Sequence, residues 1–239
     1  MRFVGSELGE AAAWEAAFPR GLGDDVRRAL TVLPSVPQAR TSSFRVLVEG
    51  EPVLIPSRIY SDEPSVAAEA ALSVTQRAVL DCLYTRHHDG RVRQRRLERV
   101  VGVIQPWVAP FVVQLVGEYV DEILLVIERV LTPELVVPHS PVAAVYGRCA
   151  AENQAFMALT GQRVVSYWNC YHRRRYPALN DYPGHAVLAA LRAAAQRPGK
   201  DAPPAGDHLA GLDVPIVITP QAVAHHDSAA SIDAQLRKA

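Results

Sequence analysis

The chain has 239 residues, with 25 basic and 25 acidic side chains and a hydrophobic fraction of 49%. This length and composition suffice for one large or two small globular domains with a real core. With a formal net charge of zero, the composition does not imply a whole-protein attraction to nucleic acid or to an anionic membrane surface.

The cysteines and the N-terminus indicate the cellular compartment. Cys82, Cys149 and Cys170 are scattered and odd in number, so they form neither a disulfide framework nor a CxxC zinc pair. The N-terminal stretch has no long apolar run after its basic start, so it is not a secretory signal. Residues 100–117 are uncharged, but prolines and glutamines interrupt them and acidic residues follow. We therefore expect a cytoplasmic protein that does not enter a membrane.

The first predicted elements are a helix and a hairpin. Residues 24–33 favour a helix that begins at Asp24 or Asp25, because acidic side chains cap and stabilise a helix start. Residues 43–60 contain two runs of alternating β-branched and polar side chains around Glu49-Gly50, which predicts a β-hairpin. A lone hairpin is marginal in water, so we expect it to lie on helices or to find a third strand.

The centre of the chain predicts three helices. The first covers 73–88 and the second 91–104, and between them either Gly90 takes a positive φ or Asp89 caps the second helix. The third is one long helix over 106–131 that is apolar nearly all round, which is typical of a helix buried on several sides.

The remaining elements are helices at 142–159 and 183–196, with a segment at 162–176 that fits helix and strand and for which we favour helix. Residues 1–197 are predicted to form a single domain, and 198–239 a linker and mobile tail with one extended apolar segment at 212–218. The predicted fold class is mainly α. It is a multi-helix bundle around one buried long helix at about 106–131, with a small N-terminal β-hairpin at about 43–60.

Two blocks of the central region, CLYTRHHDGRVRQRRLERVV and WVAPFVVQLVGEYVDEI, resemble blocks of an uncharacterised family of actinomycete proteins. The resemblance extends to SYWNCYHRR and covers about the middle half of the chain. It implies no function, so no site residue comes with it.

Arginines gather at the start of the predicted helix at 91–104. The positive end of the helix dipole lies there, so each exposed cation costs about 0.3–1 kcal/mol and a negative partner is expected. That partner is either internal (Glu118, Asp121, Glu122 or another subunit) or an external phosphate or nucleic acid, since a helix N-terminus with arginines is a natural anion site. The candidate anion- or partner-binding residues are Arg86, His88, Arg91, Arg93, Arg95, Arg96, Arg99, Arg173, Arg174 and Arg175.

A second pattern joins aromatic and basic side chains. Tyr167, Trp168, Tyr171 and Tyr176 interleave with the arginines at 173–175. Such a composition suits protein interfaces and stacked bases. It is equally compatible with core aromatics beside a solvated basic end.

Candidate metal and acid–base groups are sparse. His87, His88 and Asp89, or Cys170 and His172, supply too few convergent ligands for a metal site, and the further cluster at 225–227 falls in the predicted tail. Glu118 and Glu122 share a helix face, where we expect them to pair with an arginine such as Arg148 rather than to act in catalysis. We therefore predict no metal, no cofactor and no catalytic residue.

These patterns favour a non-enzymatic helical interaction protein that self-associates as a homo-oligomer or binds a protein partner. The alternative is a nucleic-acid or phosphate-binding module that uses the arginine-rich helix N-terminus. A second alternative is an enzyme with a pocket near Glu118 and His87.

Overall fold

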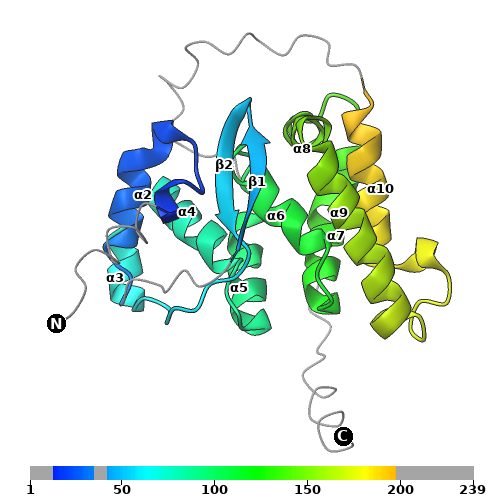
Figure 1. Cartoon of the computed structure of the whole chain (residues 1–239), viewed down its shortest axis with the longest axis horizontal. Coiled ribbons are helices and arrows are strands. Elements are labelled where there is room, and N and C mark those ends of the chain that lie inside the picture. Colours follow the sequence, from blue (N-terminus) through cyan, green and yellow to red (C-terminus); the bar gives the residue numbers. More distant parts are fainter. Residues whose placement is uncertain (1–12, 35–41, 198–239) are drawn as a thin grey trace, which may run out of the picture.

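The computed structural model describes residues 13–34 and 42–197. It is mainly helical with one two-stranded sheet near the N-terminus, which confirms the predicted fold class (Figure 1). The predicted linker and tail at 198–239, with the extended segment at 212–218, lie outside the described residues, so this domain boundary stays a prediction.

The helices lie on both sides of the hairpin. In Figure 1, α2, α3 and α4 lie on one side, α8, α9 and α10 lie on the other, and α6 runs between them. The first half contains η1 (Arg20–Leu22), α2 (Gly23–Leu30), β1 (Ser43–Val48), β2 (Glu51–Pro56), α3 (Val66–Ala70), α4 (Val74–Tyr84) and α5 (Gly90–Val100). The second half contains α6 (Ala109–Val116), α7 (Asp121–Val136), α8 (Pro141–Glu152), α9 (Gln154–Tyr167), the π-helical turn η2 (Trp168–His172), η3 (Leu179–Asp181) and α10 (Pro183–Ala195).

The hairpin follows the predicted alternation. Val46 pairs with Val53 in the antiparallel register, and both side chains are buried together with that of Ile55. Glu49 and Gly50 have φ values of 51° and 83°, as a two-residue turn that matches the strand twist requires. The hairpin finds no third strand among the described residues and lies on helices instead.

Side-chain and loop groups satisfy the edges of the hairpin. Asn153 accepts a hydrogen bond from the Leu47 backbone N–H at 2.7 Å and donates one to the Leu47 carbonyl at 2.8 Å. On the other edge, the Leu54 N–H donates to the Ala16 carbonyl at 2.7 Å. Asn153 has φ −123° and ψ 52°, which ends α8 and precedes α9. The single helix predicted at 142–159 is therefore wrong, because the chain breaks where Asn153 turns to the strand.

The long helix predicted at 106–131 is also wrong, because it consists of α6 and α7 with a break at 117–120. A Cβ on Gly117 would lie 3.2 Å from the Cβ of Arg163, so the chain passes close to α9 at this residue. Val120 is extended, and Asp121 begins α7 with an acidic first turn that the helix dipole favours. The helix then continues to Val136.

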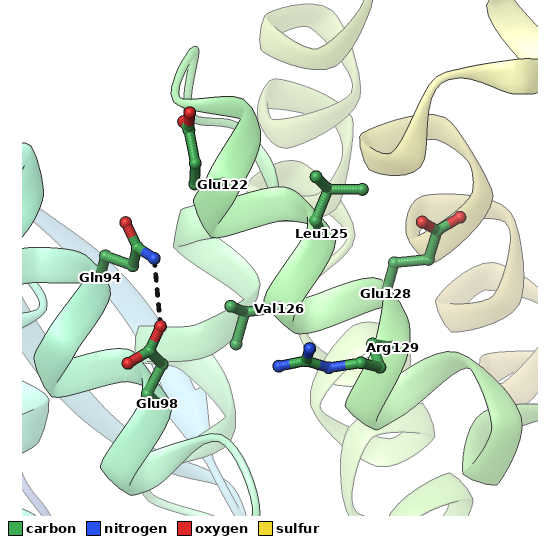
Figure 2. A pocket seen from close by; sticks show the side chains of 7 residues that line it. All are labelled: Gln94, Glu98, Glu122, Leu125, Val126, Glu128 and Arg129. Atoms are coloured by element: carbon green, nitrogen blue, oxygen red, sulfur yellow. Dashed lines mark hydrogen bonds between the residues drawn. The ribbon is translucent and has the colours of Figure 1, made fainter. Parts of the chain in front are cut away.

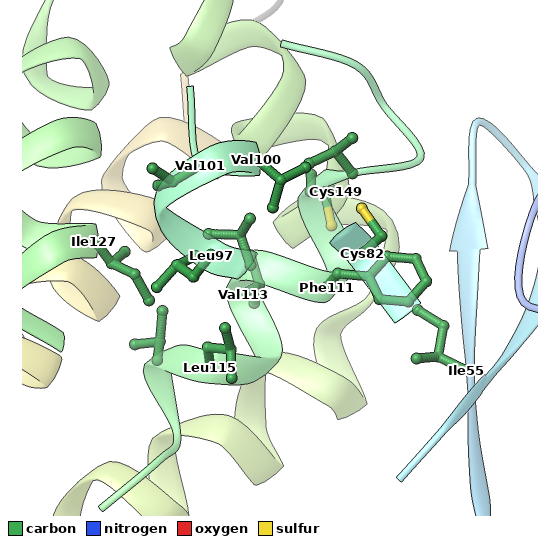
Figure 3. Packing of buried hydrophobic residues seen from close by; sticks show 14 of the residues in the cluster. Ile55, Cys82, Leu97, Val100, Val101, Phe111, Val113, Leu115, Ile127 and Cys149 are labelled. Carbon is green, nitrogen blue, oxygen red and sulfur yellow. The ribbon is translucent and has the colours of Figure 1, made fainter. Parts of the chain in front are cut away.

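The core is centred on α6. All eight residues of this helix are buried. Figure 3 shows Phe111 of α6 between Ile55 of the hairpin and Cys82 of α4, with Leu97 of α5 and Ile127 of α7 nearby. The predicted central role of the apolar stretch therefore holds for its first half, while α7 leaves Glu122, Leu125 and Arg129 exposed.

The ends of α4 and α5 define the turn that carries the predicted arginine site. Ser73 and Gln76 form a capping box at the start of α4, which ends at Tyr84. Asp89 caps α5 by accepting a hydrogen bond from the Arg91 N–H at 2.8 Å. Of the two alternatives, the Asp89 cap is confirmed. Gly90 is the first residue of α5, and its φ is not positive. The segment at 162–176 is helical through α9 and η2, as favoured.

Within the described ranges, no helix combines the length and apolarity that a membrane crossing needs. The uncharged residues 100–117 do not form one continuous helix. The first of those residues end α5, and most of the others form the buried α6.

Two helical glycines make a matched test of the packing between helices. A Cβ on Gly147 of α8 would lie 2.8 Å from the Ala194 carbonyl oxygen, which belongs to the backbone of α10. A Cβ on Gly161 of α9 would instead meet the tip of the Arg192 side chain. We expect Gly147→Ala to lower the free energy of unfolding by about 1–3 kcal/mol, because the two backbones must separate.

Gly161→Ala is the control for that substitution. The guanidinium of Arg192 can swing away, and alanine adds about 1 kcal/mol of helix propensity, so the stability should change little or rise. Urea unfolding curves of both variants measure the difference. Equal effects of the two substitutions would show that the close backbone contact between α8 and α10 does not determine the loss of stability.

Candidate functional site

Three of the predicted anion-binding arginines, Arg86, Arg93 and Arg96, lie inside the protein and form what we call the inner arginine cluster. The Arg86 guanidinium donates to the backbone carbonyls of Pro56 at 3.3 Å and Ser57 at 2.8 Å. Burial lowers the pKa of Arg86 to about 9, although the nearby Glu118 carboxylate acts in the opposite direction. Arg86 therefore fastens the exit of β2 to the end of α4.

Arg93 joins α5 to the loop between α6 and α7. Its side chain is 1% exposed, and its Nη2 lies 3.3 Å from Oε2 of Glu118. Its Nη1 donates to the carbonyls of His87 and His88, both at 2.9 Å. Arg58 adds a second cation 3.8 Å from Glu118. The carboxylate that the arginine-rich helix start requires is thus internal.

Arg96 is surrounded by acidic side chains. Its guanidinium donates to Asp81 at 2.9 Å and binds Glu63 and Glu69 as well. It also lies over the Tyr84 ring, 4.8 Å from the centroid. Burial by itself would lower the pKa of Arg96, but the hydrogen bonds to Glu69 and Asp81 raise it above its usual range. Burial raises the pKa of Asp81 to about 6 against the pull of Arg96.

Of the two alternatives for these arginines, the internal partner applies to Arg93, which pairs with Glu118, and Arg86 and Arg96 also have internal partners. Their guanidinium groups are desolvated and already hydrogen-bonded, so a ligand cannot reach them without unfolding this region. The other members of the predicted site on α5 are exposed. Arg95 binds Glu63, Arg99 lies 3.1 Å from Glu69, and Arg91 is exposed in the first turn of the helix. His88, just before α5, is exposed and stacks on Tyr60.

The predicted partner of Glu118 is an arginine such as Arg148, but Glu118 pairs with Arg93 and Arg58. Arg148 instead forms surface ion pairs with Glu49 and Glu152. The expectation that Glu118 has an arginine partner holds, and its partner Arg93 belongs to the arginine-rich helix start for which Glu118 is one of the expected internal partners.

His87 is also held by the backbone. The Asp89 N–H donates to Nδ1 of His87 at 3.1 Å, so Nε2 carries the proton and donates to the Ser61 carbonyl at 2.9 Å. Burial lowers the pKa of His87, and the neighbouring His88 adds to this shift. Two surface depressions lie where α5 meets α7 and along α9, and neither His87 nor Glu118 lines either of them.

The first depression lies where α5 meets α7 (Figure 2). Val126 and Leu125 contribute its apolar surface, and Gln94 donates to Glu98 at 3.1 Å along one side. Glu122, Glu128 and Arg129 complete the lining. In the described ranges, no group of three or more histidine, cysteine, aspartate or glutamate side chains is placed to hold a metal ion.

The second depression runs along α9, whose outer face is unusual. The residues that line it include Gly161 and Gln162 of α9, Leu179 of η3, and His185 and Leu188 of α10. The exposed positions of α9 are all uncharged, and we call them the α9 outer face: Gln154, Ala155, Ala158, Leu159, Gln162, Val165 and Ser166. On α5, by contrast, each exposed position carries a charge.

The predicted aromatic and basic pattern forms a surface at the end of α9. The rings of Tyr119, Tyr167 and Tyr171 contact one another with centroid distances of 6.0–6.1 Å, and we call these three residues the tyrosine triad. His172 bonds the Tyr119 backbone carbonyl through Nε2 at 2.7 Å. Sequence reasoning missed Tyr119, because it belongs to the loop at 117–120 that the long-helix prediction concealed.

The arginines that follow η2 differ in their partners. Arg173 lies over the Trp168 ring at 5.5 Å and binds the Asn169 side chain at 3.3 Å. Arg175 forms an ion pair with Asp121 at 2.6 Å, and Tyr176 donates to the same carboxylate at 3.0 Å. Arg174 is exposed. All three predicted arginines at 173–175 thus remain at the surface, in contrast to the inner arginine cluster.

No protein-family model matches the chain, and no curated protein or solved structure matches it either. The resemblance of the central blocks to uncharacterised actinomycete proteins brings no function. The function of each candidate surface is therefore inferred from its geometry and its chemistry.

Arg95 and Arg96 offer a matched test of the inner arginine cluster. Arg96→Gln should lower the free energy of unfolding by about 3–5 kcal/mol, since it leaves buried carboxylates without their cation. Arg95→Gln removes a partly exposed ion pair to Glu63 and should cost less than about 1 kcal/mol. Chemical denaturation measures both, and equal losses would contradict the burial of Arg96.

His87 should make the stability depend on pH. Its folded pKa lies below its unfolded pKa of about 6.5, so the unfolded state binds more protons and stability falls as the pH drops below that value. His87→Gln removes this contribution while keeping a polar side chain. We expect the slope of unfolding free energy against pH between pH 7 and 5 to be smaller in the variant, and an unchanged slope would show that His87 titrates normally.

Proposed function

We propose that this chain is a non-catalytic interaction protein that self-associates through the α9 outer face. The observation that carries the proposal is the lack of charge at every exposed position of α9, Gln154–Tyr167. Interface cores are depleted of charged residues, whereas helices that face water normally carry them. Leu159 and Val165 add apolar surface, being 42% and 46% exposed.

The order of residues on α9 suits a second copy of the same helix. If two α9 helices cross in antiparallel fashion about a two-fold axis at Gln162, Leu159 of one copy meets Val165 of the other. The same axis places Ala158 opposite Ser166. Small side chains then oppose small ones, and the two Gln162 amides can hydrogen-bond to each other. None of the α9 outer-face residues carries a charge, and Arg192 of α10, which lines the same depression, is exposed at its border.

The two alternatives have less support from the geometry. An enzyme at Glu118 and His87 needs polar groups that converge on a cleft, but both side chains are engaged in holding the backbone and the inner arginine cluster. A phosphate site at the start of α5 needs free guanidinium groups, but Arg93 and Arg96 are buried with internal partners. We place the function in the cytoplasm, in line with the absence of a disulfide framework in the sequence.

The test is the mass of the protein in solution. Light scattering after size exclusion should show an oligomer that dissociates on dilution. Leu159→Arg should weaken self-association at least about tenfold, because it places a charge at the centre of the contact. The thermal melt at high dilution should stay unchanged, since Leu159 is exposed in the single chain.

Val66→Arg is the matched control. Val66 is 86% exposed on α3, so an arginine at this position adds the same charge to an apolar surface position outside α9. It should leave the mass unchanged. A parent protein that is monomeric at all concentrations, or a Leu159→Arg variant that associates like the parent, would contradict the proposal.

A further inference from the structure

We propose that the tyrosine triad and the arginines beside it bind single-stranded nucleic acid, with bases stacked on the rings and phosphates on the guanidinium groups. This inference concerns a different surface from the α9 outer face and does not depend on self-association. It also differs from the predicted phosphate site at α5, whose central arginines are buried.

The triad exposes aromatic surface that the fold does not use. Tyr171 is 66% exposed and Tyr119 is 50% exposed, whereas Tyr84, Tyr146 and Tyr182 are fully buried. Large exposed rings in contact with one another leave apolar faces in water, which disfavours the free state and favours a ligand with flat faces. Unpaired bases have such faces, and each base that stacks on an aromatic side chain gains binding energy whatever its identity.

The surface is fixed before any ligand arrives. The His172 ring bonds the Tyr119 carbonyl at 2.7 Å and stacks on Tyr182 with the centroids 5.2 Å apart. The π-helical turn η2 carries Tyr171 and His172, and π-turns inside helices frequently mark functional sites. A surface whose rings are already positioned loses less conformational entropy on binding.

The charge near the triad complements a phosphate backbone. Arg173 and Arg174 are exposed immediately after η2, and Arg163 lies against Gly117 at the base of the Tyr119 loop. The nearest carboxylates, Glu118 and Asp121, are buried and already paired with arginines. The exposed acids on neighbouring elements are Glu122 at the start of α7, Asp181 in η3 and Asp89 before α5, whose neighbour Gly90 lies against Val120. Arginines therefore flank the triad along the chain: Arg163 lies one helical turn before Tyr167, and Arg173 and Arg174 follow Tyr171 within three residues.

A single strand fits these features better than a duplex does. The bases of a duplex are stacked on one another, so the rings of the triad could not reach their faces. An acidic peptide would satisfy the arginines but would leave the tyrosine faces exposed. The combination of stacking surface and positive charge therefore selects a polyanion with free aromatic bases.

The experiment is a fluorescence-polarisation titration of the full chain with a labelled single-stranded oligothymidylate and, separately, a hairpin duplex. The parent should bind the single strand more tightly than the duplex, with an affinity that falls as salt rises. Tyr171→Ala should weaken binding by about 5- to 100-fold, the range for loss of one stacked base, whereas Tyr171→Phe should bind like the parent. Arg174→Gln should reduce the dependence of the affinity on salt.

Tyr60→Ala is the matched control. Tyr60 is 55% exposed and stacks on His88, so it is a comparable surface ring outside the triad, and its loss should leave binding unchanged. Three results would overturn the proposal: no binding by the parent, equal binding of the duplex, or a Tyr171→Ala variant that binds like the parent while its thermal melt is unchanged. Competition by polyglutamate as strong as that by unlabelled oligothymidylate would equally exclude base stacking and indicate an acidic protein partner.

Discussion

The fold depends on burying guanidinium groups and supplying each with negative charge or carbonyl oxygens. A buried cation without partners costs several kcal/mol, so Arg86, Arg93 and Arg96 require the polar groups that surround them. These groups come from separate segments. Arg96 connects α5 to α3, α4 and the segment before α3, whereas Arg93 connects α5 to Glu118 beyond the buried α6. Apolar packing alone would allow these helices to slide past one another. The inner arginine cluster fixes their relative positions.

Specific polar contacts also hold the hairpin in place. Its inner face packs apolar side chains on the core, but that packing does not satisfy the backbone groups at its edges. The Asn153 side chain supplies a donor and an acceptor to Leu47, much as a neighbouring strand would. The backbone of Asn153 leaves the helical conformation while its side chain faces the strand. This is where α8 ends and α9 begins. One polar residue therefore completes the sheet and sets the direction of α9.

Periodicity predicts the parts of the fold that apolar burial determines. The hairpin around Glu49-Gly50 and the helices α2, α5 and α10 follow from spacing, and the Asp89 cap of α5 follows from its capping residue. The helix α2 begins at Gly23 without a side-chain cap, so the predicted start at Asp24 or Asp25 is off by one or two residues. Periodicity failed at 117–120 and at Asn153, where a helical pattern resumes directly after a break at a tertiary contact. Gly117 followed by Asp121 and Glu122 is a helix end and a helix start that the sequence does contain, but the surrounding valines and leucines conceal it. The sequence left an internal carboxylate such as Glu118 and an external anion as alternatives for the arginines of α5. It could not choose between them, because charge density along a sequence does not distinguish an exposed arginine from one whose partners come from distant segments.

The internal use of charge on α5 leaves other surfaces to meet partners. Arginine and acidic side chains in the first half of the described chain largely bind one another, so that region is a scaffold rather than a recognition surface. Beyond Asn153 the pattern reverses, because α9 presents no charged residue at its exposed positions and η2 is followed by exposed arginines. The break at Asn153 separates these two regions, and the break at 117–120 carries Tyr119 to the end of α9. The two places where helical periodicity fails are therefore the two that shape the candidate binding surfaces, as expected if local rules yield where a surface serves a purpose other than folding.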